Sequence, residues 1–148
     1  NIPLPPGSGN GAYISVFEKV VRPALEKFSP DFIFVASGYD ASVNDPLGRM
    51  MVTSSGYRAM AKILIDTAGT FCNGKLLVAH EGGYSLSYVP YCGLAVIEEL
   101  ANKRSTVLDP NLSKRDDIPG QDLQPHQADI INKAAECIKL ISSNYQSD

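Results

Sequence analysis

Two short apolar runs, set between segments with helical periodicity, constrain the fold of this chain most strongly. The runs are "FIFVA" at residues 32–36 and "KLLVA" at residues 75–79. A continuous apolar run of this length is typical of a strand that is buried on both faces of a sheet. Strands that alternate with helices favour a parallel sheet with helices packed against it. The sequence therefore predicts an α/β fold.

Apolar residues recur at helical spacing on either side of these runs. The segments expected to be helical are 13–28, 54–70, 90–102 and 125–144. Pro23 interrupts the first of them and should kink or restart the helix, because proline lacks an N–H and crowds the preceding turn. Residues 37–53 and 103–124 lack the periodicity, and we predict that they form loops.

Composition excludes several classes of protein. The net charge of the 148 residues is −3 with no basic block, which argues against a nucleic-acid-binding surface. No apolar run approaches the length of a membrane span. The three cysteines are odd in number and widely spaced, which fits neither a disulfide framework nor a zinc finger. We expect reduced thiols that pack as small hydrophobic groups in an intracellular protein.

The start of the chain has the character of a connecting segment. It reads "NIPLPPGSGNG", with no initiator Met and no basic segment followed by an apolar one, as a signal peptide would have. A length of 148 residues favours one compact unit. We therefore expect a piece of a larger domain.

Each predicted strand is followed by a turn that presents a polar residue. Asp40 follows the first strand in "SGYDA", and Tyr84 follows the second in "HEGGYS". Ligands of open α/β sheets bind beyond the carboxyl ends of the strands, so the two residues share one crevice if the strands are neighbours. A carboxylate there can bind a metal or act as a base, and a tyrosine hydroxyl can donate to an oxyanion.

Simpler structural interpretations of these residues remain open on the sequence alone. Asp40 is also typical of a turn or a helix cap, and Gly82-Gly83-Tyr84 is typical of a turn with a buried ring. Asp45, which precedes Pro46, is expected to initiate a turn. His80 and Glu81 are compatible with structural roles beside the sheet.

The combination of segments resembles the zinc-dependent histone deacetylase family, in particular its class II and bacterial deacetylase-like branch. The resemblance rests on "NIPLPPGSGNGAY", "RPALEKFSPDFIFVASGYDA", "NDPLG", "HEGGYS" and "VPYCGLAVIEEL". It implies the three-layer, parallel-sheet fold shared by arginases and deacetylases, present here only in part. Residues 1–148 would then be the C-terminal part of a histone deacetylase-like catalytic domain.

The resemblance also assigns roles to particular residues. Asp40 corresponds to a ligand of the catalytic zinc, and Tyr84 to the residue that donates a hydrogen bond to the substrate carbonyl. Gly82 and Gly83 correspond to the backbone that walls the acyl-lysine channel, and Leu47 to the apolar residue at its rim. Polyamine-preferring relatives are acidic at the rim position, so Leu47 favours an acyl-lysine substrate. The implied reaction is zinc-assisted hydrolysis of an acetyl amide.

The family's other zinc ligands and its histidine base come from Asp-x-His and His-His segments that this sequence lacks. Its two histidines, His80 and His126, stand in neither setting. A catalytic zinc needs three protein ligands, so the chain alone is expected to be inactive. The alternatives are a catalytically silent interaction module and a deacetylase for acetylpolyamines or other amides.

The resemblance implies partners and a location as well. The expected partners are acetylated lysine in a protein substrate, such as a histone, and the missing N-terminal half of the domain. Neither nucleic acid nor membrane is expected as a direct partner. As a chromatin regulator of this family, the protein would be nuclear or cytoplasmic in a eukaryote and cytoplasmic in a bacterium.

Overall fold

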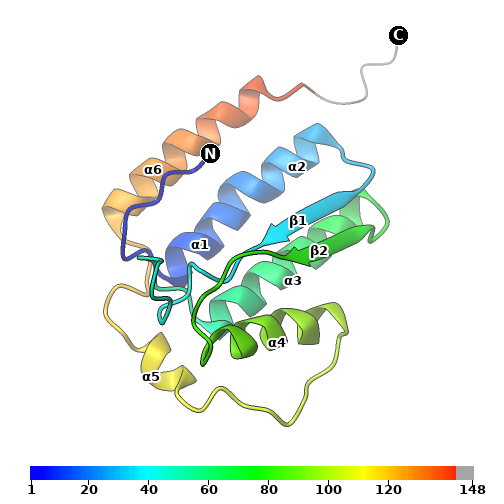
Figure 1. Cartoon of the computed structure of the whole chain (residues 1–148). Coiled ribbons are helices and arrows are strands. Elements are labelled where there is room, and N and C mark those ends of the chain that lie inside the picture. The colour runs from blue at the N-terminus through cyan, green and yellow to red at the C-terminus, as the bar shows by residue number, and fades with distance from the viewer. Residues whose placement is uncertain (143–148) are drawn as a thin grey trace.

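The computed structural model describes residues 1–142, in which strands β1 and β2 form a parallel sheet (Figure 1). Strand β1 spans Ile33–Ser37 and strand β2 spans Leu76–His80, with Phe34 opposite Leu77 in the register. Both strands begin and end one residue later than the sequence predicts. The parallel α/β architecture is confirmed.

Helices account for most of the remaining regular structure. They are α1 (Asn10–Val16), the π-helical turn η1 (Phe17–Val21), α2 (Arg22–Phe28), α3 (Ser54–Phe71), α4 (Val89–Leu100), α5 (Leu112–Asp116), α6 (Pro125–Glu136) and the 3-10 turn η2 (Cys137–Leu140). Helix α5 lies inside a segment predicted to be a loop, so that prediction is wrong for five residues. The last predicted helix ends earlier than expected, at Glu136, and its final two residues lie outside the described part of the chain.

The first predicted helix is divided in front of Pro23. Helix α1 passes into the π-helical turn η1 and then into α2, whose first turn contains Pro23, and the backbone stays in the right-handed helical region at both junctions. Proline is tolerated in a first turn because its missing N–H is not needed there, whereas inside a helix its ring crowds the carbonyl four residues back. The wider π turn gives that carbonyl room. The predicted interruption is therefore observed as a π turn through which the helix continues, and not as a restart of the helix.

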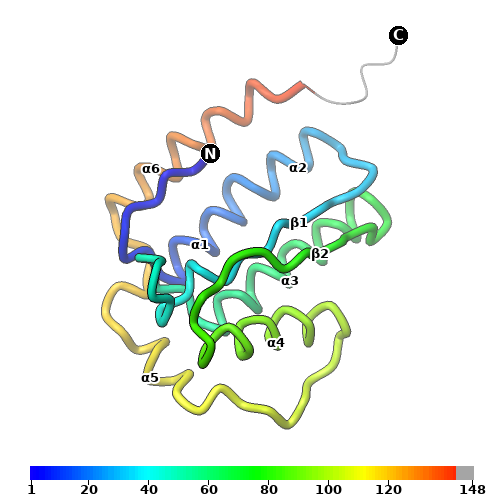
Figure 2. Tube along the Cα trace, in the orientation of Figure 1, coloured from blue at the N-terminus to red at the C-terminus, as the bar shows by residue number. Residues whose placement is uncertain are grey.

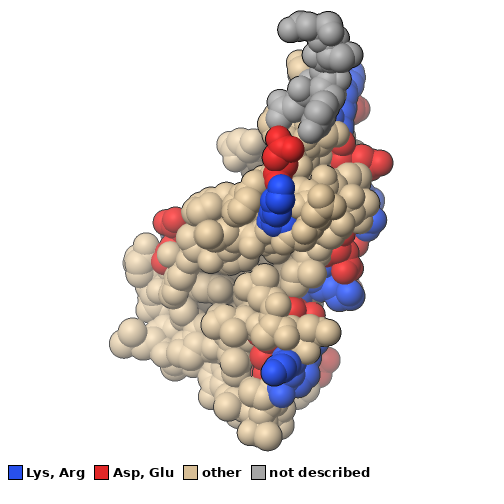
Figure 3. Space-filling model, turned by 90° about the vertical axis from the view of Figure 1, so that its right-hand side faces the viewer, with Lys and Arg blue, Asp and Glu red and all other residues tan. Residues whose placement is uncertain are grey.

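The two faces of the sheet differ in burial. Ile33 and Leu76 pack with Ala68 and Cys72 in one apolar cluster, which places α3 against that face. On the other face Phe34 is 63% exposed and Leu77 is 45% exposed. The prediction that the strands are buried on both faces is wrong for this chain, because no described element covers the second face. On the side of the molecule shown in Figure 3, much of the surface is free of charged side chains.

The largest apolar cluster lies beneath the ends of the strands, where the segments after β1 and β2 run close together (Figure 2). It contains the buried residues Tyr39, Val52, Tyr57, Met60, Ala61, Tyr88, Cys92 and Val96. Cys72 and Cys92 are buried, as expected of small hydrophobic groups, but Cys137 is exposed, so the expectation is wrong for that thiol.

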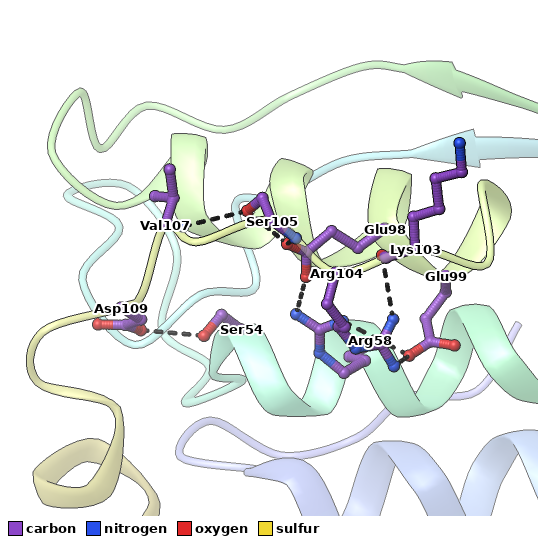
Figure 4. Close-up of polar contacts among 9 residues, drawn as sticks. All are labelled: Ser54, Arg58, Glu98, Glu99, Lys103, Arg104, Ser105, Val107 and Asp109. Carbon is purple, nitrogen blue, oxygen red and sulfur yellow. Dashed lines mark hydrogen bonds and ion pairs between the residues drawn. The ribbon is translucent and has the colours of Figure 1, made fainter.

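A polar network holds α4 and the following loop to α3 (Figure 4). Glu98 of α4 accepts hydrogen bonds from the Ser105 hydroxyl (2.6 Å) and from Arg58 of α3 (2.6 Å). The bonds from Ser105, together with Arg58, lower the pKa of Glu98 to about 2. Nearer the start of α3, the Ser54 hydroxyl donates to Asp109 (2.9 Å). This network fixes the helix that follows Tyr84 relative to the helix that follows Asp40.

None of the helices within residues 1–142 combines the length and the hydropathy of a membrane-spanning segment.

Candidate active site

The pairing of β1 and β2 continues past both strands and brings their following loops together. The N–H of Glu81 donates to the carbonyl of Ser37 (3.0 Å), and the N–H of Tyr39 donates to the carbonyl of Gly82 (2.7 Å). Tyr39 is buried, and its ring meets the Tyr57 ring with centroids 5.1 Å apart. Asp40, the next residue, is therefore held directly beside Gly82.

Asp40 and Tyr84 meet around Gly82. A methyl group on the Cα of Gly82 would lie 2.5 Å from Oδ2 of Asp40 and 3.4 Å from the hydroxyl oxygen of Tyr84. The same test at Gly38 places a methyl 2.9 Å from Oδ1 of Asp40. The carboxylate thus occupies space that two glycines leave free, and the tyrosine hydroxyl borders the same space. The structure brings together the two side chains that the sequence singled out.

Gly83 serves the close packing of the loop after β2. Its φ of +131° is unfavourable for residues with a side chain, and a methyl there would approach Tyr39 Cβ to 2.9 Å and Val89 Cγ2 to 3.0 Å. The backbone just before Tyr84 is therefore pressed between the residue before Asp40 and the start of α4. The channel-wall role of Gly82 and Gly83 stays a prediction.

Leu47 lies on a loop that folds back onto Asp40. A methyl on Gly48 would lie 1.8 Å from the carbonyl oxygen of Asp40, so the two backbones are in direct contact. The side chain of Leu47 is 70% exposed beside this contact. This location is compatible with the rim of a site around Asp40, and the rim role itself stays a prediction.

Asp45 is the residue whose role the sequence did not reveal. Its Oδ1 accepts the N–H of Leu47 (2.8 Å) and of Gly48 (2.8 Å), as the predicted turn requires. Its Oδ2 accepts the N–H of Tyr84 (2.7 Å), which lies 39 residues further along the chain. Partial burial alone would raise the pKa of Asp45, but these backbone donors outweigh it and lower the pKa. The signal in the sequence was the Asp-Pro pair, which indicated only the local turn.

His80 and His126 lie on different elements and do not form a metal site together. His80 ends β2, and its ring meets the Tyr39 ring edge-on with centroids 5.0 Å apart. His126 lies in the first turn of α6 and is exposed. Among residues 1–142, no group of three or more His, Cys, Asp or Glu side chains could hold a metal ion. The described residues therefore offer one candidate zinc ligand, Asp40, and not the three that a catalytic zinc needs.

The sequence model of the histone deacetylase domain family matches residues 1–100, which include β1, β2, the loops that follow them and α4. The chain belongs to the histone deacetylase family. This membership confirms the resemblance that the sequence motifs indicated.

The relatives of this chain include bacterial and archaeal proteins. It is 54% identical over 110 residues to a histone deacetylase-like amidohydrolase of Pseudomonas aeruginosa, an alignment that covers 74% of this chain and 29% of that protein. It is 36% identical over 102 residues to a probable deacetylase of Archaeoglobus fulgidus, covering 68% and 28%. The chain thus spans less than a third of the length of these two relatives.

Solved structures of histone deacetylases share the fold. The structure of the histone deacetylase Clr3 superimposes with a TM-score of 0.76 at 28% identity, covering 95% of this chain and 22% of the other. The HDA15 HD domain gives a TM-score of 0.65 at 35% identity, covering 92% and 38%. These matches confirm the deacetylase-type fold, and this chain corresponds to a part of each structure.

Proposed function

We propose that this chain is the C-terminal part of a zinc-dependent deacetylase domain that hydrolyses N-acetyl amides, with acetyl-lysine in a protein as its substrate. The observation that carries the proposal is the meeting of the Asp40 carboxylate and the Tyr84 hydroxyl around Gly82. A carboxylate oxygen that can bind a metal and a hydroxyl donor facing the same space are two of the groups that metal-assisted amide hydrolysis uses.

Each residue has a distinct task in this proposal. Asp40 would supply one oxygen ligand to zinc, which, when bound, would polarise an acetyl carbonyl and lower the pKa of a bound water. Tyr84 donates its hydroxyl proton in a hydrogen bond to the oxygen that becomes negatively charged in the transition state. Its side chain is 52% exposed, so an acetyl group can reach it. The glycines keep the space between the two groups free of side chains.

The remaining ligands and the base must come from outside the described residues. Asp40 is a single carboxylate, whereas a catalytic zinc needs three protein ligands. The exposed apolar side chains of Phe34 and Leu77, and the unpaired outer edges of β1 and β2 within residues 1–142, offer a surface for further elements. We infer that an N-terminal half of the domain covers this surface and completes the site.

The rim residue favours acetyl-lysine over acetylated polyamines. A polyamine is a polycation and is recognised by acidic groups near the mouth of a site. The exposed side chain at the proposed rim is Leu47, which is apolar. When the acetyl group of acetyl-lysine lies in such a site, the apolar methylene stem of the side chain passes the rim, and an apolar rim can contact it.

Steady-state kinetics of the parent protein, the complete polypeptide that contains this chain, tests the proposal. We expect hydrolysis of an acetyl-lysine peptide in preference to acetylspermidine. Tyr84→Phe should lower kcat by about a hundredfold or more and change KM little, because its donor acts in the transition state. Asp40→Asn should lower the zinc content, and excess zinc should partly restore its activity. Near-normal turnover of Tyr84→Phe would overturn the proposed role.

The exposed sheet face also favours a second candidate, a catalytically silent module that binds a partner. An apolar surface of this kind supports association whether or not a zinc site is ever completed. The two candidates differ in one measurement, since the silent module would show no zinc-dependent hydrolysis in the parent protein.

A further inference from the structure

The carboxylate of Asp45 connects the two loops that carry the proposed site. One oxygen accepts two N–H groups of its own turn, from Leu47 and Gly48, both at 2.8 Å. The other oxygen accepts the N–H of Tyr84 at 2.7 Å. A local aspartate turn needs only the first set of bonds. The bond to Tyr84 is therefore an additional feature, and it joins loops that follow different strands.

The hydrogen bond from the Tyr84 N–H to Asp45 fixes the backbone of the loop that carries Tyr84. Gly83, immediately before it, has a φ of +131° and the conformational freedom of glycine. Tyr84 itself is exposed, and within the described residues its backbone N–H is held by the Asp45 carboxylate. Without this bond, the direction in which Tyr84 leaves the backbone would depend only on how Gly82 and Gly83 pack against Tyr39 and Val89.

The same turn is also fixed relative to Asp40. Gly48 donates to Asp45, and its Cα lies so close to the Asp40 carbonyl that a methyl group would meet that oxygen at 1.8 Å. A continuous set of contacts therefore runs from Asp40 through Gly48 and Asp45 to Tyr84. Hydrogen bonds to an ionised carboxylate are stronger than those between neutral groups. The backbone N–H donors lower the pKa of Asp45, which shows that they favour its ionised form.

We propose that Asp45 is a positioning residue for amide hydrolysis, which holds the Tyr84 hydroxyl in place relative to the Asp40 carboxylate. This inference rests on the proposed deacetylase function. Asp45 acts through Tyr84 and the rim turn, and it does not touch the acetyl group. The contact that distinguishes this role from that of a simple turn residue is the bond between Oδ2 and the Tyr84 N–H.

A double-mutant cycle in the parent protein tests the inference. Asp45→Asn keeps the shape of the side chain but leaves one accepting oxygen for two loops. We expect kcat on an acetyl-lysine peptide to fall about tenfold to a hundredfold, with KM within about threefold. In a Tyr84→Phe background the same substitution should change kcat by less than about threefold, because the hydroxyl that it positions is already absent.

Two further variants separate positioning from general damage. Asp66→Asn removes the same charge from an exposed pair with Lys62 on α3 and should leave kcat unchanged. Asp45→Ser keeps a short oxygen for the turn but cannot bridge to Tyr84, so it should reproduce the loss of kcat and provides a second test if the Asn variant unfolds. An equal loss of kcat with and without the Tyr84 hydroxyl, or no loss at all, would overturn the inference.

Hydrogen–deuterium exchange keeps this test separate from that of the overall function. A parent protein that does not hydrolyse acetyl-lysine would refute the proposed function but would not test the bond between Asp45 and the Tyr84 N–H. In that case the peptide covering residues 82–86 should still exchange faster in Asp45→Asn than in Asp66→Asn. Unchanged exchange there would show that the bond to Tyr84 does not hold the loop, and the positioning role would be refuted.

Discussion

Gly82→Ala is the substitution that tests the site geometry most directly. The added methyl would lie 2.5 Å from Oδ2 of Asp40, and Cβ atoms are essentially never found within 3.0 Å of a neighbour. The carboxylate must therefore move by half an ångström or more. The obstacle is the end of a side chain and not backbone, so we expect the fold to survive while the site changes. The methyl would also enter the space in front of the Tyr84 hydroxyl, 3.4 Å away.

The expected loss follows from the tolerance of catalytic geometry. Catalytic groups must be held within roughly 0.5 Å of their productive positions, and a displacement of about 1 Å can cost about a hundredfold in rate. We therefore expect kcat/KM of the parent protein on an acetyl-lysine peptide to fall by roughly 10- to 100-fold, or about 1.4–2.7 kcal/mol of transition-state stabilisation. Steady-state kinetics measures this loss, and thermal unfolding checks that the variant is folded.

Gly69→Ala provides the matched control. Gly69 lies inside α3, and a methyl there would have no neighbour within 4 Å. The substitution should leave kcat/KM unchanged and stabilise the protein by about 0.5–1 kcal/mol, because alanine loses less conformational entropy in a helix. If the Gly82→Ala variant kept the kcat/KM of the wild type, as the Gly69→Ala control should, the argument that Asp40 and Tyr84 act around Gly82 would be refuted.

Three further predictions concern stability, metal binding and association. The pKa of Glu98 is lowered from 4.5 to about 2, so its contribution to stability should be complete above pH 4.5 and disappear as the pH falls to about 2. Urea unfolding at several pH values should show this dependence flattened in Glu98→Gln, and identical profiles would contradict it. The isolated chain should bind zinc weakly in calorimetry, and a tight one-to-one site that Asp40→Ala abolishes would contradict this. The isolated chain should associate through its exposed sheet face in sedimentation velocity, less so in Phe34→Ser, whereas a monodisperse monomer at high concentration would count against it.

The sequence was most informative where local pattern determines structure. The apolar runs placed β1 and β2 to within one residue, and Pro23 indicated the irregular turn η1 that joins α1 to α2. The burial of the strands was predicted wrongly, because an apolar run shows that a face can be covered and not which element covers it. Helix α5 was missed, since five polar-rich residues carry no helical periodicity.

For the site, the sequence indicated Asp40 and Tyr84 as separate turn residues, and only the pairing of the strands could place them together. The role of Asp45 could not be predicted from its own turn. Its bond to Tyr84 depends on how two loops 39 residues apart are placed by the sheet. Contacts of this kind arise from tertiary packing and leave no local pattern in the sequence.

The order of elements from β1 through α3 to β2 has a consequence for how the site forms. Asp40 lies inside this contiguous strand–helix–strand unit and Tyr84 lies just beyond its end, so the contacts that align them close between neighbouring parts of one segment. Pairing within one segment requires less loop closure than pairing with a distant part of a chain. We therefore expect the two groups to become aligned early in folding, on a nucleus that other segments then join. A time-resolved exchange experiment would show protection of the Tyr39 and Glu81 amides among the first to appear.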